Sequence, residues 1–131
     1  MREVIFPPTL AQAVATSGFS PALRAGDLLF LTGATGADTS GVMPPDAETQ
    51  TRNAIGKALE ILAAADTDAQ AVVEVTSYHI GIHDHFDAVD AILRELLGVP
   101  LPAWTAVEVA GLRRPGAVIE LRIVAHVPLA V

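Results

Sequence analysis

Glu120 is an acidic residue in the middle of an apolar stretch, AVIELRIVA, at residues 117–125. Side chains alternate between the two faces of a strand, so this stretch predicts one continuous apolar face: Ala117, Ile119, Leu121, Ile123 and Ala125. Glu120 then points to the opposite face, where its carboxylate can act as a general acid or base. The alternative interpretation is structural, an ion pair with a lysine or with an Arg122 in a neighbouring subunit.

Three of the four histidines lie close together in the sequence, at positions 79, 83 and 85. A metal site is disfavoured, because His83 and His85 fall at a helix start, where side chains two positions apart diverge by about 200°. We expect no metal ligand here. His85 is interpreted as a solvated first-turn residue, and His79 as a hydrogen-bonded strand residue whose titration near neutral pH also allows proton transfer.

Other chemistries have little support in the sequence. Gly33, Gly36 and Gly41 match neither the dinucleotide-binding nor the P-loop spacing, and they are predicted to be turn glycines. The chain has no cysteine, which excludes disulfides, a thiolate nucleophile and sulfur metal ligands. No serine has a nucleophile elbow around it.

The composition points to an oligomer that does not bind nucleic acid. The formal net charge is −7, from 15 acidic and 8 basic residues, and no basic run exists to neutralise phosphates. Hydrophobic residues make up 51% of the chain and charged residues only 18%, which is apolar for a small domain. Part of this apolar surface is expected to face another subunit.

The length of 131 residues fits a single domain, residues 1–131. There is no run of about 20 apolar residues that would cross a membrane, so we expect no membrane partner. The first residues also lack the apolar run of roughly 7 to 15 that a secretory signal needs. A cytoplasmic location is the resulting expectation, and the absence of cysteine agrees with it.

The first half of the chain predicts strands followed by a helix. Residues 28–31 read as a strand bounded by turns, and residues 13–19 are interpreted as its hairpin partner. A helix is expected after Asp46 as N-cap, with apolar residues at three and four spacing through residue 65. Residues 71–82 read as a strand with one row of side chains facing the same side: Val73, Val75, Ser77 and His79.

The second half predicts another helix and two more strands. The helix is expected to be capped by Asp84 and to end at Gly98. Residues 104–111 and 116–127 are then interpreted as an antiparallel hairpin joined by GLRRPG. This order predicts an α+β fold in which two helices cover one face of a mixed sheet, while the other face is left for a second subunit.

Five stretches together carry a family resemblance: FSPALRAGDLLFLTGATG, AETQTRNAIGKALEILAAA, VVEVTSYHIGIHDHFDAVDAIL, PAWTAVEVAGL and AVIELRIVAHV. In order and spacing they resemble the RidA (YjgF) family, also labelled endoribonuclease L-PSP, over nearly the whole chain. The resemblance implies a chorismate mutase-like α+β subunit and a homotrimer with three clefts between subunits. It also implies hydrolysis of reactive enamines and imines to ketoacids and ammonia, without a cofactor.

Residue by residue, the resemblance carries over only in part. The family's substrate-binding backbone position matches Gly33, and its acid, thought to position the attacking water, matches Glu120. Four other substrate-binding positions differ. The family's arginine is replaced by Trp104, its tyrosine by Phe19, its cysteine or threonine by Ala106, and its asparagine by Asp90.

These replacements leave two interpretations of the cleft. Replacing arginine by Trp104 removes a bidentate clamp for a carboxylate, which costs about 1.5 to 3 kcal/mol of binding or more. As an enzyme, the protein would then act on a different small conjugated substrate, which Trp104 and Phe19 stack against. As a binding module, it would keep the trimer with an indole in the cleft and hold a small molecule or a partner protein without chemistry. Ribonuclease activity is disfavoured because the acidic chain offers no basic groove.

Overall fold

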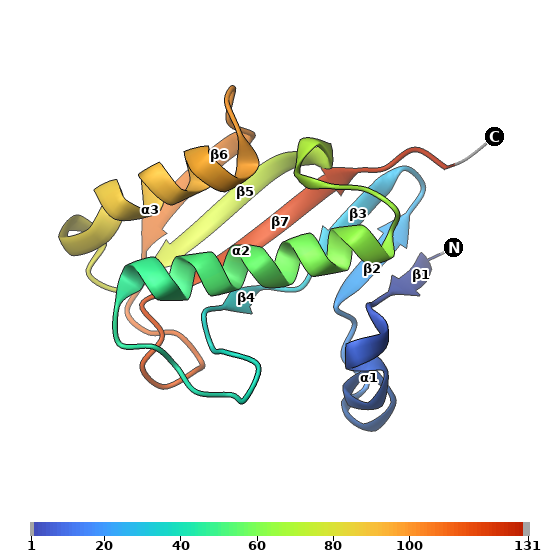
Figure 1. Ribbon diagram of the computed structural model, residues 1–131, viewed down its shortest axis with the longest axis horizontal. Helices are drawn as coiled ribbons and strands as arrows, with labels where there is room; N and C mark the ends of the chain where they lie inside the picture. Colours follow the sequence, from blue (N-terminus) through green and yellow to red (C-terminus); the bar gives the residue numbers. More distant parts are fainter. Residues whose placement is uncertain (1, 130–131) are drawn as a thin grey trace.

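Seven strands form one mixed sheet in the computed structural model, which describes residues 2–129 (Figure 1). The strands are β1 (Arg2–Ile5), β2 (Ala22–Ala25), β3 (Leu28–Leu31), β4 (Ala34–Thr35), β5 (Val72–His79), β6 (Ala103–Glu108) and β7 (Ile119–His126). Their order is β1-β2-β3-β7-β5-β6, and β4 also pairs with β7. Only β5 and β6 are parallel, and the other pairs are antiparallel. The predicted α+β class with a mixed sheet is confirmed.

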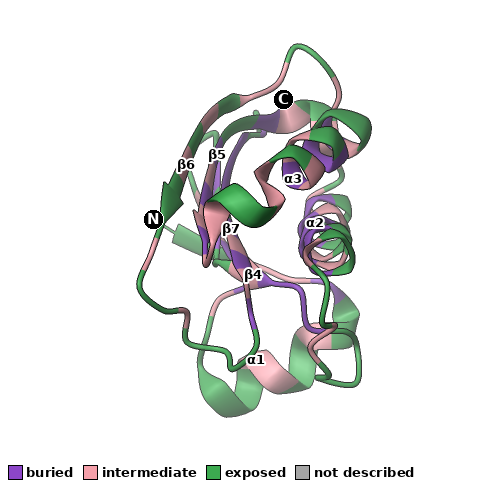
Figure 2. Ribbon diagram, turned by 90° about the vertical axis from the view of Figure 1, so that its left-hand side faces the viewer, coloured by how far each residue is buried: buried purple, intermediate pink, exposed green. Residues whose placement is uncertain are grey.

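Two long helices, α2 (Ala47–Ala64) and α3 (Ile82–Leu97), cover the same face of this sheet (Figure 2). The predicted N-cap of α2 is confirmed, because the Asp46 carboxylate accepts hydrogen bonds from the Thr49 backbone N–H at 2.8 Å and its hydroxyl at 2.7 Å. These bonds lower the pKa of Asp46. A shorter helix, α1 (Ala11–Ser17), and two 3₁₀ turns, η1 (Pro8–Leu10) and η2 (Ala69–Ala71), complete the described elements. None of the helices among these residues is long and apolar enough to cross a membrane.

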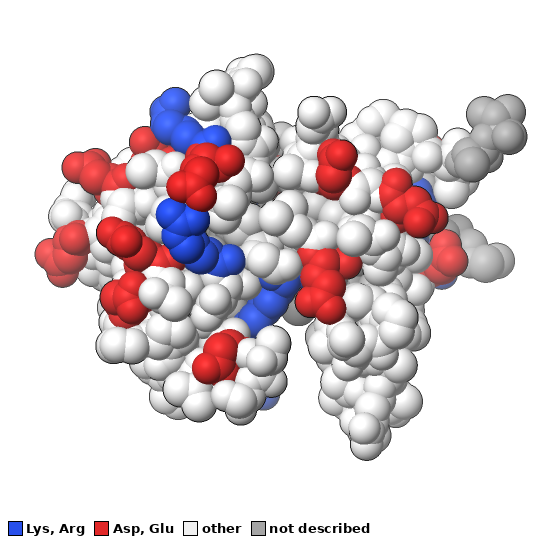
Figure 3. Space-filling view, in the orientation of Figure 1, with Lys and Arg blue, Asp and Glu red and all other residues white. Residues whose placement is uncertain are grey.

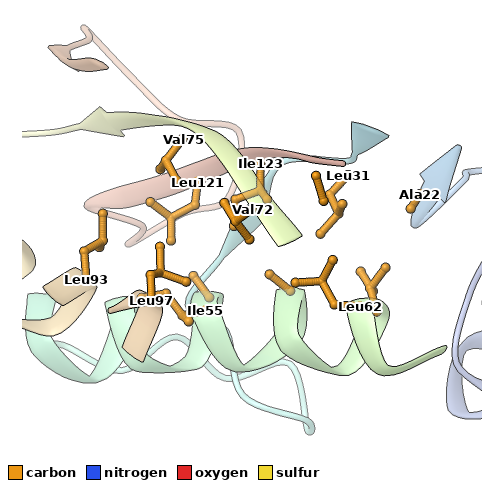
Figure 4. Packing of buried hydrophobic residues seen from close by; sticks show 14 of the residues in the cluster. Ala22, Leu31, Ile55, Leu62, Val72, Val75, Leu93, Leu97, Leu121 and Ile123 are labelled. Carbon is orange, nitrogen blue, oxygen red and sulfur yellow. The ribbon is translucent and has the colours of Figure 1, made fainter. Parts of the chain in front are cut away.

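The hydrophobic core lies between the sheet and the two helices. Figure 4 shows Leu121 and Ile123 of β7 pointing toward Ile55 and Leu62 of α2. The predicted apolar face of the last strand is confirmed, because each of its members is at most 7% exposed: Ala117, Ile119, Leu121, Ile123 and Ala125. Neither α2 nor α3 covers the other face of the sheet, and large apolar side chains are exposed there: Leu28, Phe30 and Val107.

The segment at residues 13–19 is not a strand, so the prediction of a hairpin there was wrong. Residues 11–17 form α1, and Gly18 ends it with φ 76°, donating its backbone N–H to the Val14 carbonyl at 3.0 Å. A glycine in this conformation is a common helix terminator. The hairpin partner of β3 is β2, across a turn that contains Gly26 with φ 60°.

The predicted hairpin between residues 104–111 and 116–127 is also wrong, because β5 lies between β6 and β7. The chain runs from β5 through α3 to a parallel β6, as in a crossover unit. It then passes the end of β5, where Val109 donates to the His79 carbonyl and Ile80 donates to the Val118 carbonyl, both at 2.9 Å. The loop between β6 and β7 is long enough to pass the end of β5. A loop rich in turn residues is compatible both with this passage and with a hairpin, so the sequence alone did not separate them.

Two smaller predictions were corrected by local backbone geometry. Helix α3 begins after Gly81, at φ 66°, and Asp84 lies in its first turn instead of capping it. In β5, an irregularity between Val72 and Glu74 moves Val73 out of the buried row, where it is 44% exposed. One inserted residue shifts the alternation of a strand, so the row resumes at Val75.

Candidate functional site

The Glu120 carboxylate lies directly against the backbone of Gly33. A Cβ atom on Gly33 would stand 2.5 Å from Glu120 Oε2. Glu120 points to the uncovered face of the sheet, because its neighbours Ile119 and Leu121 are in the core. It is half-buried between Thr35 of β4 and Tyr78 of β5, its cross-strand partners. Gly33 therefore serves as a close-approach position and not as the turn glycine that was predicted.

The backbone just before β7 is fixed by Gln50, a fully buried side chain on α2. Its Oε1 accepts the Val118 backbone N–H at 2.9 Å, and its Nε2 donates to the carbonyls of Gly116 at 3.0 Å and Pro44 at 2.7 Å. Gly36 packs directly on the backbone of Gln50, with no room for a side chain, so it too is a close-approach glycine. The hydrogen bond from Val118 to Gln50 fixes the backbone two residues before Glu120.

Two further polar side chains of α2 hold the backbone that follows Gly33. Lys57 Nζ donates to the Thr35 carbonyl at 2.8 Å, and Asn53 Nδ2 donates to the Gly36 carbonyl at 2.9 Å. Desolvation by burial, together with the nearby Arg114, lowers the pKa of Lys57. Together these bonds hold β4 between α2 and β7, which fixes Gly33 beside Glu120.

Phe19 belongs to the same region of the molecule. It follows α1, and the next two residues contact Thr32: the Thr32 hydroxyl donates to the Ser20 carbonyl, and its N–H donates to the Pro21 carbonyl at 2.9 Å. Phe19 is 38% exposed. Because Thr32 precedes Gly33, these bonds connect the Phe19 loop to the Glu120 region. We call Phe19, Gly33 and Glu120 the Glu120 group.

Trp104 lies on the opposite face of the sheet, facing α3. Its indole Nε1 donates to Ser77 Oγ at 2.8 Å, and its ring stacks on Phe86 with centroids 5.2 Å apart and planes 11° apart. The side chain is half-buried and packs against the core. The indole is therefore anchored from inside the subunit by a hydroxyl and an aromatic ring.

The other two predicted binding residues lie near Trp104. Ala106 is two residues further along β6, on the same face, and is half-buried. Asp90 is one helical turn after Phe86 on α3, and its Oδ2 accepts from Arg94 Nε at 3.0 Å. We call Trp104, Ala106, Asp90 and Phe86 the Trp104 group.

A pair of histidines extends this group. His79 is fully buried, and its Nε2 lies 2.7 Å from Ser77 Oγ while its Nδ1 lies 3.2 Å from His85 Nε2. Burial, with a smaller effect of His85, lowers the pKa of His79 to about 4, and burial also lowers the pKa of His85. The prediction of a hydrogen-bonded strand histidine at His79 is confirmed. The solvated role predicted for His85 is wrong, because it contacts His79 and is only partly exposed.

The structure thus brings the predicted site residues into two groups that one chain does not combine. Glu120 faces the uncovered side of the sheet, whereas Trp104 faces α3 on the other side.

Within residues 2–129 there is no cluster of three or more side chains that could hold a metal ion. On the helix-covered face, basic side chains lie singly or beside acidic ones, such as Arg52 with Glu95 at 2.7 Å (Figure 3).

The side chains that support the site were not predicted from the sequence. Gln50, Asn53 and Lys57 share one stripe of α2 at three and four spacing, next to its apolar positions. Polar residues on a buried helix face must find partners, and this was the available signal. Ser77 and Phe86 carried no such signal, because their role depends on the pairing between β5 and β6, whereas residues 104–111 were predicted to pair with residues 116–127.

The fold, the Glu120 group and the Trp104 group together define the class of protein. It is an α+β subunit with two helices on one face of its sheet, and its candidate site residues are divided between both faces. A family model described as endoribonuclease L-PSP matches residues 10–127. The chain belongs to this family, which is also known as the YjgF or RidA family.

Several relatives match over almost their whole length. The RutC family protein YjgH of Escherichia coli (strain K12) is 33% identical over 128 residues, covering 97% of this chain and 96% of the relative. A solved structure of protein YjgH has a TM-score of 0.85 at 32% identity, with 98% of both chains covered. The Rid family protein YyfA from Yersinia pestis also has a TM-score of 0.85, at 25% identity, covering 97% of this chain and 100% of the other.

Proposed function

We propose that this protein is a homotrimer that hydrolyses small reactive enamines or imines, or related conjugated metabolites, in clefts between its subunits. Its substrates differ from those of relatives that carry an arginine at the position of Trp104. The proposal rests mainly on one observation, the half-buried Glu120 carboxylate held against the Gly33 backbone on the uncovered face of the sheet.

A second subunit is needed to combine the two groups of site residues. Trp104 lies on β6, which is an edge strand, so it can approach another copy of the chain from the side of the sheet. The uncovered face of the sheet presents Leu28 and Phe30, each 38% exposed, as apolar surface for such a copy. In this assembly the Glu120 group of one subunit meets the Trp104 group of the next.

The chemistry proposed for Glu120 is the movement of a proton. Protonation of an enamine at carbon by a solvent proton gives an iminium ion, and a water molecule held by Glu120 attacks the iminium carbon. Glu120 takes a proton from this water and returns it to the nitrogen of the resulting carbinolamine. The C–N bond then breaks while the hydroxyl group loses its proton to solvent, which forms the carbonyl product and releases ammonia. General acid–base catalysis of this kind contributes about 10²- to 10⁴-fold to a rate. Among residues 2–129 no ion pair engages Glu120, which supports this role.

Nearby charges do not favour the structural interpretation of Glu120. Arg122, two residues further along β7, already contacts Glu74 Oε1 of the same chain at 3.4 Å. The lysine of α2, Lys57, donates to the Thr35 carbonyl. Both Arg122 and the lysine, the candidate partners for an ion pair with Glu120, therefore have other contacts within the chain.

A second candidate function is a trimer that binds a small molecule or a partner protein without chemistry. The observation that favours it is the anchored indole of Trp104. It stands at the position where the family resemblance implies an arginine that binds the substrate. In this case the apolar ring fills part of the cleft, and the protein keeps only the assembly and a binding surface.

The test compares Glu120→Gln with Glu74→Gln, a control that changes a carboxylate on the same face and leaves Glu120 in place. Imines are generated in solution, ammonia release is measured, and the mass of the assembly is determined by light scattering. We expect Glu120→Gln to lose turnover by about 10²-fold or more while remaining a trimer, and Glu74→Gln to stay active. Full activity in Glu120→Gln removes the mechanism, and tryptophan quenching without any ammonia supports the binding function. A monomer in solution contradicts both.

A further inference from the structure

The contacts of Ser77 determine the direction of a hydrogen-bond chain behind Trp104. An indole N–H can only donate, so Ser77 Oγ accepts from Trp104 at 2.8 Å. Ser77 is fully buried, and its own hydroxyl hydrogen therefore needs an acceptor. Of its two side-chain partners, only His79 Nε2, at 2.7 Å, offers a lone pair.

The same reasoning assigns the tautomer of His79. If Nε2 accepts from Ser77, the proton of the neutral ring is on Nδ1, which then donates to His85 Nε2 at 3.2 Å. His85 lines an open hollow of about 380 Å³ over the first turns of α3, together with Phe86. The chain thus runs from the indole of Trp104, through two fully buried side chains, to a partly exposed histidine.

We propose that Ser77, His79 and His85 are positioning residues for Trp104, and that their hydrogen-bond chain fixes the indole as a rigid wall of the candidate site. Phe86 holds the ring by stacking, and Ser77 fixes its rotation through the N–H. This inference takes its functional meaning from the proposed function, but the anchoring of the indole can be tested without any substrate.

A rigid apolar wall also specifies the kind of ligand it can accept. The indole Nε1–H is used inside the subunit, so it is not available to a ligand as a donor. Trp104 therefore offers only its ring surface, which suits a flat, apolar or aromatic part of a substrate and not a carboxylate. The replacement of a guanidinium by an anchored indole changes both the charge and the mobility of this position.

Trp104 is the only tryptophan of the chain, so its fluorescence reports this site alone. In Ser77→Ala we expect a shift of emission to longer wavelength and a rise of about twofold or more in acrylamide quenching, because the freed ring becomes mobile and wetter. The control is Thr76→Val, a nearly isosteric change on the opposite face of the same strand. Unchanged emission and quenching in a folded Ser77→Ala variant, or equal changes in the control, would overturn the proposal.

A measurement on the unmodified protein covers the case in which Ser77→Ala does not fold. In ¹⁵N-labelled protein near neutral pH, we expect the indole N–H of Trp104 to exchange with solvent about tenfold more slowly than a free indole, or slower still. We also expect His79 to carry its proton on Nδ1. A fast-exchanging indole proton, or a His79 ring protonated on Nε2, contradicts the chain. Neither the exchange rate of the Trp104 indole N–H nor the position of the His79 proton involves turnover. The anchoring of the indole can therefore be contradicted while hydrolase activity is found, and it can be supported while no such activity is found.

Discussion

The Oε2 atom of Glu120 lies 2.5 Å from the point where a Cβ atom of residue 33 would stand, so the carboxylate uses space that only glycine leaves free. The residues come from different parts of the chain, and separate contacts from α2 hold each of them. Gln50 fixes the backbone just before β7, and Lys57 and Asn53 fix the backbone after Gly33. Their proximity is thus built into the fold and does not depend on one flexible loop.

Gly33→Ala is expected to reduce activity with little effect on stability. The new Cβ would meet the far end of a flexible carboxylate side chain, which can rotate away, so the fold tolerates the change. The rotation displaces Glu120 by about 1 Å or more, and such a misplacement can cost about a hundredfold in rate. Turnover and urea unfolding are measured together.

The matched control is Gly56→Ala, at an exposed position in α2 where a Cβ would meet nothing within 4 Å. It should keep full activity and stabilise the protein by up to about 1 kcal/mol, because alanine is the better helix former. A Gly33→Ala variant that is as active as this control would show that Glu120 does not need its present position.

Stability is expected to decrease with acid because of His79. Its pKa is about 4 in the folded protein and 6.5 for the free side chain, so the unfolded chain binds more protons between these values. The contribution is therefore fully present above pH 6.5 and is lost as the pH falls toward 4, by up to about 3 kcal/mol. The causes of the lowered pKa of His79 are burial and, to a smaller extent, the neighbouring His85. Burial also lowers the pKa of His85, against a smaller opposing effect of Asp84.

Urea unfolding at several pH values between 4 and 7.5 measures this loss. In His79→Gln the dependence on pH in this window should become weaker, whereas His83→Gln, at an exposed position on the same helix turn as His85, should keep it. If the unfolding free energy depends on pH equally in both variants, the acid sensitivity comes from groups other than His79.

The general fold was predictable because local signals and tertiary structure agree in most of the chain. Asp46 caps a helix whose apolar positions do face the core, and the alternation around Glu120 places the carboxylate correctly. The strand pairing near Trp104 was not predictable, since a loop with turn residues is compatible with both a hairpin and a passage around β5. A single inserted residue at Val73 likewise leaves no clear trace in the sequence.

The candidate site was predictable only one residue at a time. Glu120 stood out as an acid among apolar neighbours, but its contact with Gly33 depends on β4, which is only two residues long. The face on which Trp104 lies followed from the parallel pairing with β5, in which Trp104 is opposite Val75. Interpretations that depend on pairing between distant strands therefore failed, whereas local alternation placed the side chains of the last strand correctly and failed in β5 only at Val73.

Glu108 is predicted to stabilise the start of α3. Its Oε1 accepts the backbone N–H of Ile82 at 3.0 Å, which is one of the N–H groups that a helix cannot satisfy itself. Glu108→Ala should cost about 1 kcal/mol of unfolding free energy, in the range of a lost helix cap. Glu108→Gln keeps an oxygen acceptor at this position and should lose less, and equal losses in both variants would point to charge instead of the hydrogen bond.

Replacing Trp104 by arginine tests whether this position sets the substrate range. A guanidinium can bind a carboxylate through two parallel hydrogen bonds, so Trp104→Arg should raise kcat/KM for substrates with a carboxylate by about tenfold or more. The loss of stacking on Phe86 and of the bond to Ser77 should lower stability by about 1–3 kcal/mol. The quantity to compare is therefore the ratio of the kcat/KM values for an anionic and an uncharged imine. A smaller fraction of folded protein lowers both values equally, so it does not change this ratio.

The matched variants separate charge from the removal of the ring. Trp104→Gln also removes the indole but adds no charge, and Trp104→Lys adds a charge without the planar fork of arginine. If position 104 contacts the substrate, the preference for the anionic imine should rise most in Trp104→Arg, less in Trp104→Lys and least in Trp104→Gln. An unchanged ratio in all three, with each variant still a folded trimer, would mean that residue 104 lies outside the cleft. Glu120 would then act with a different binding surface.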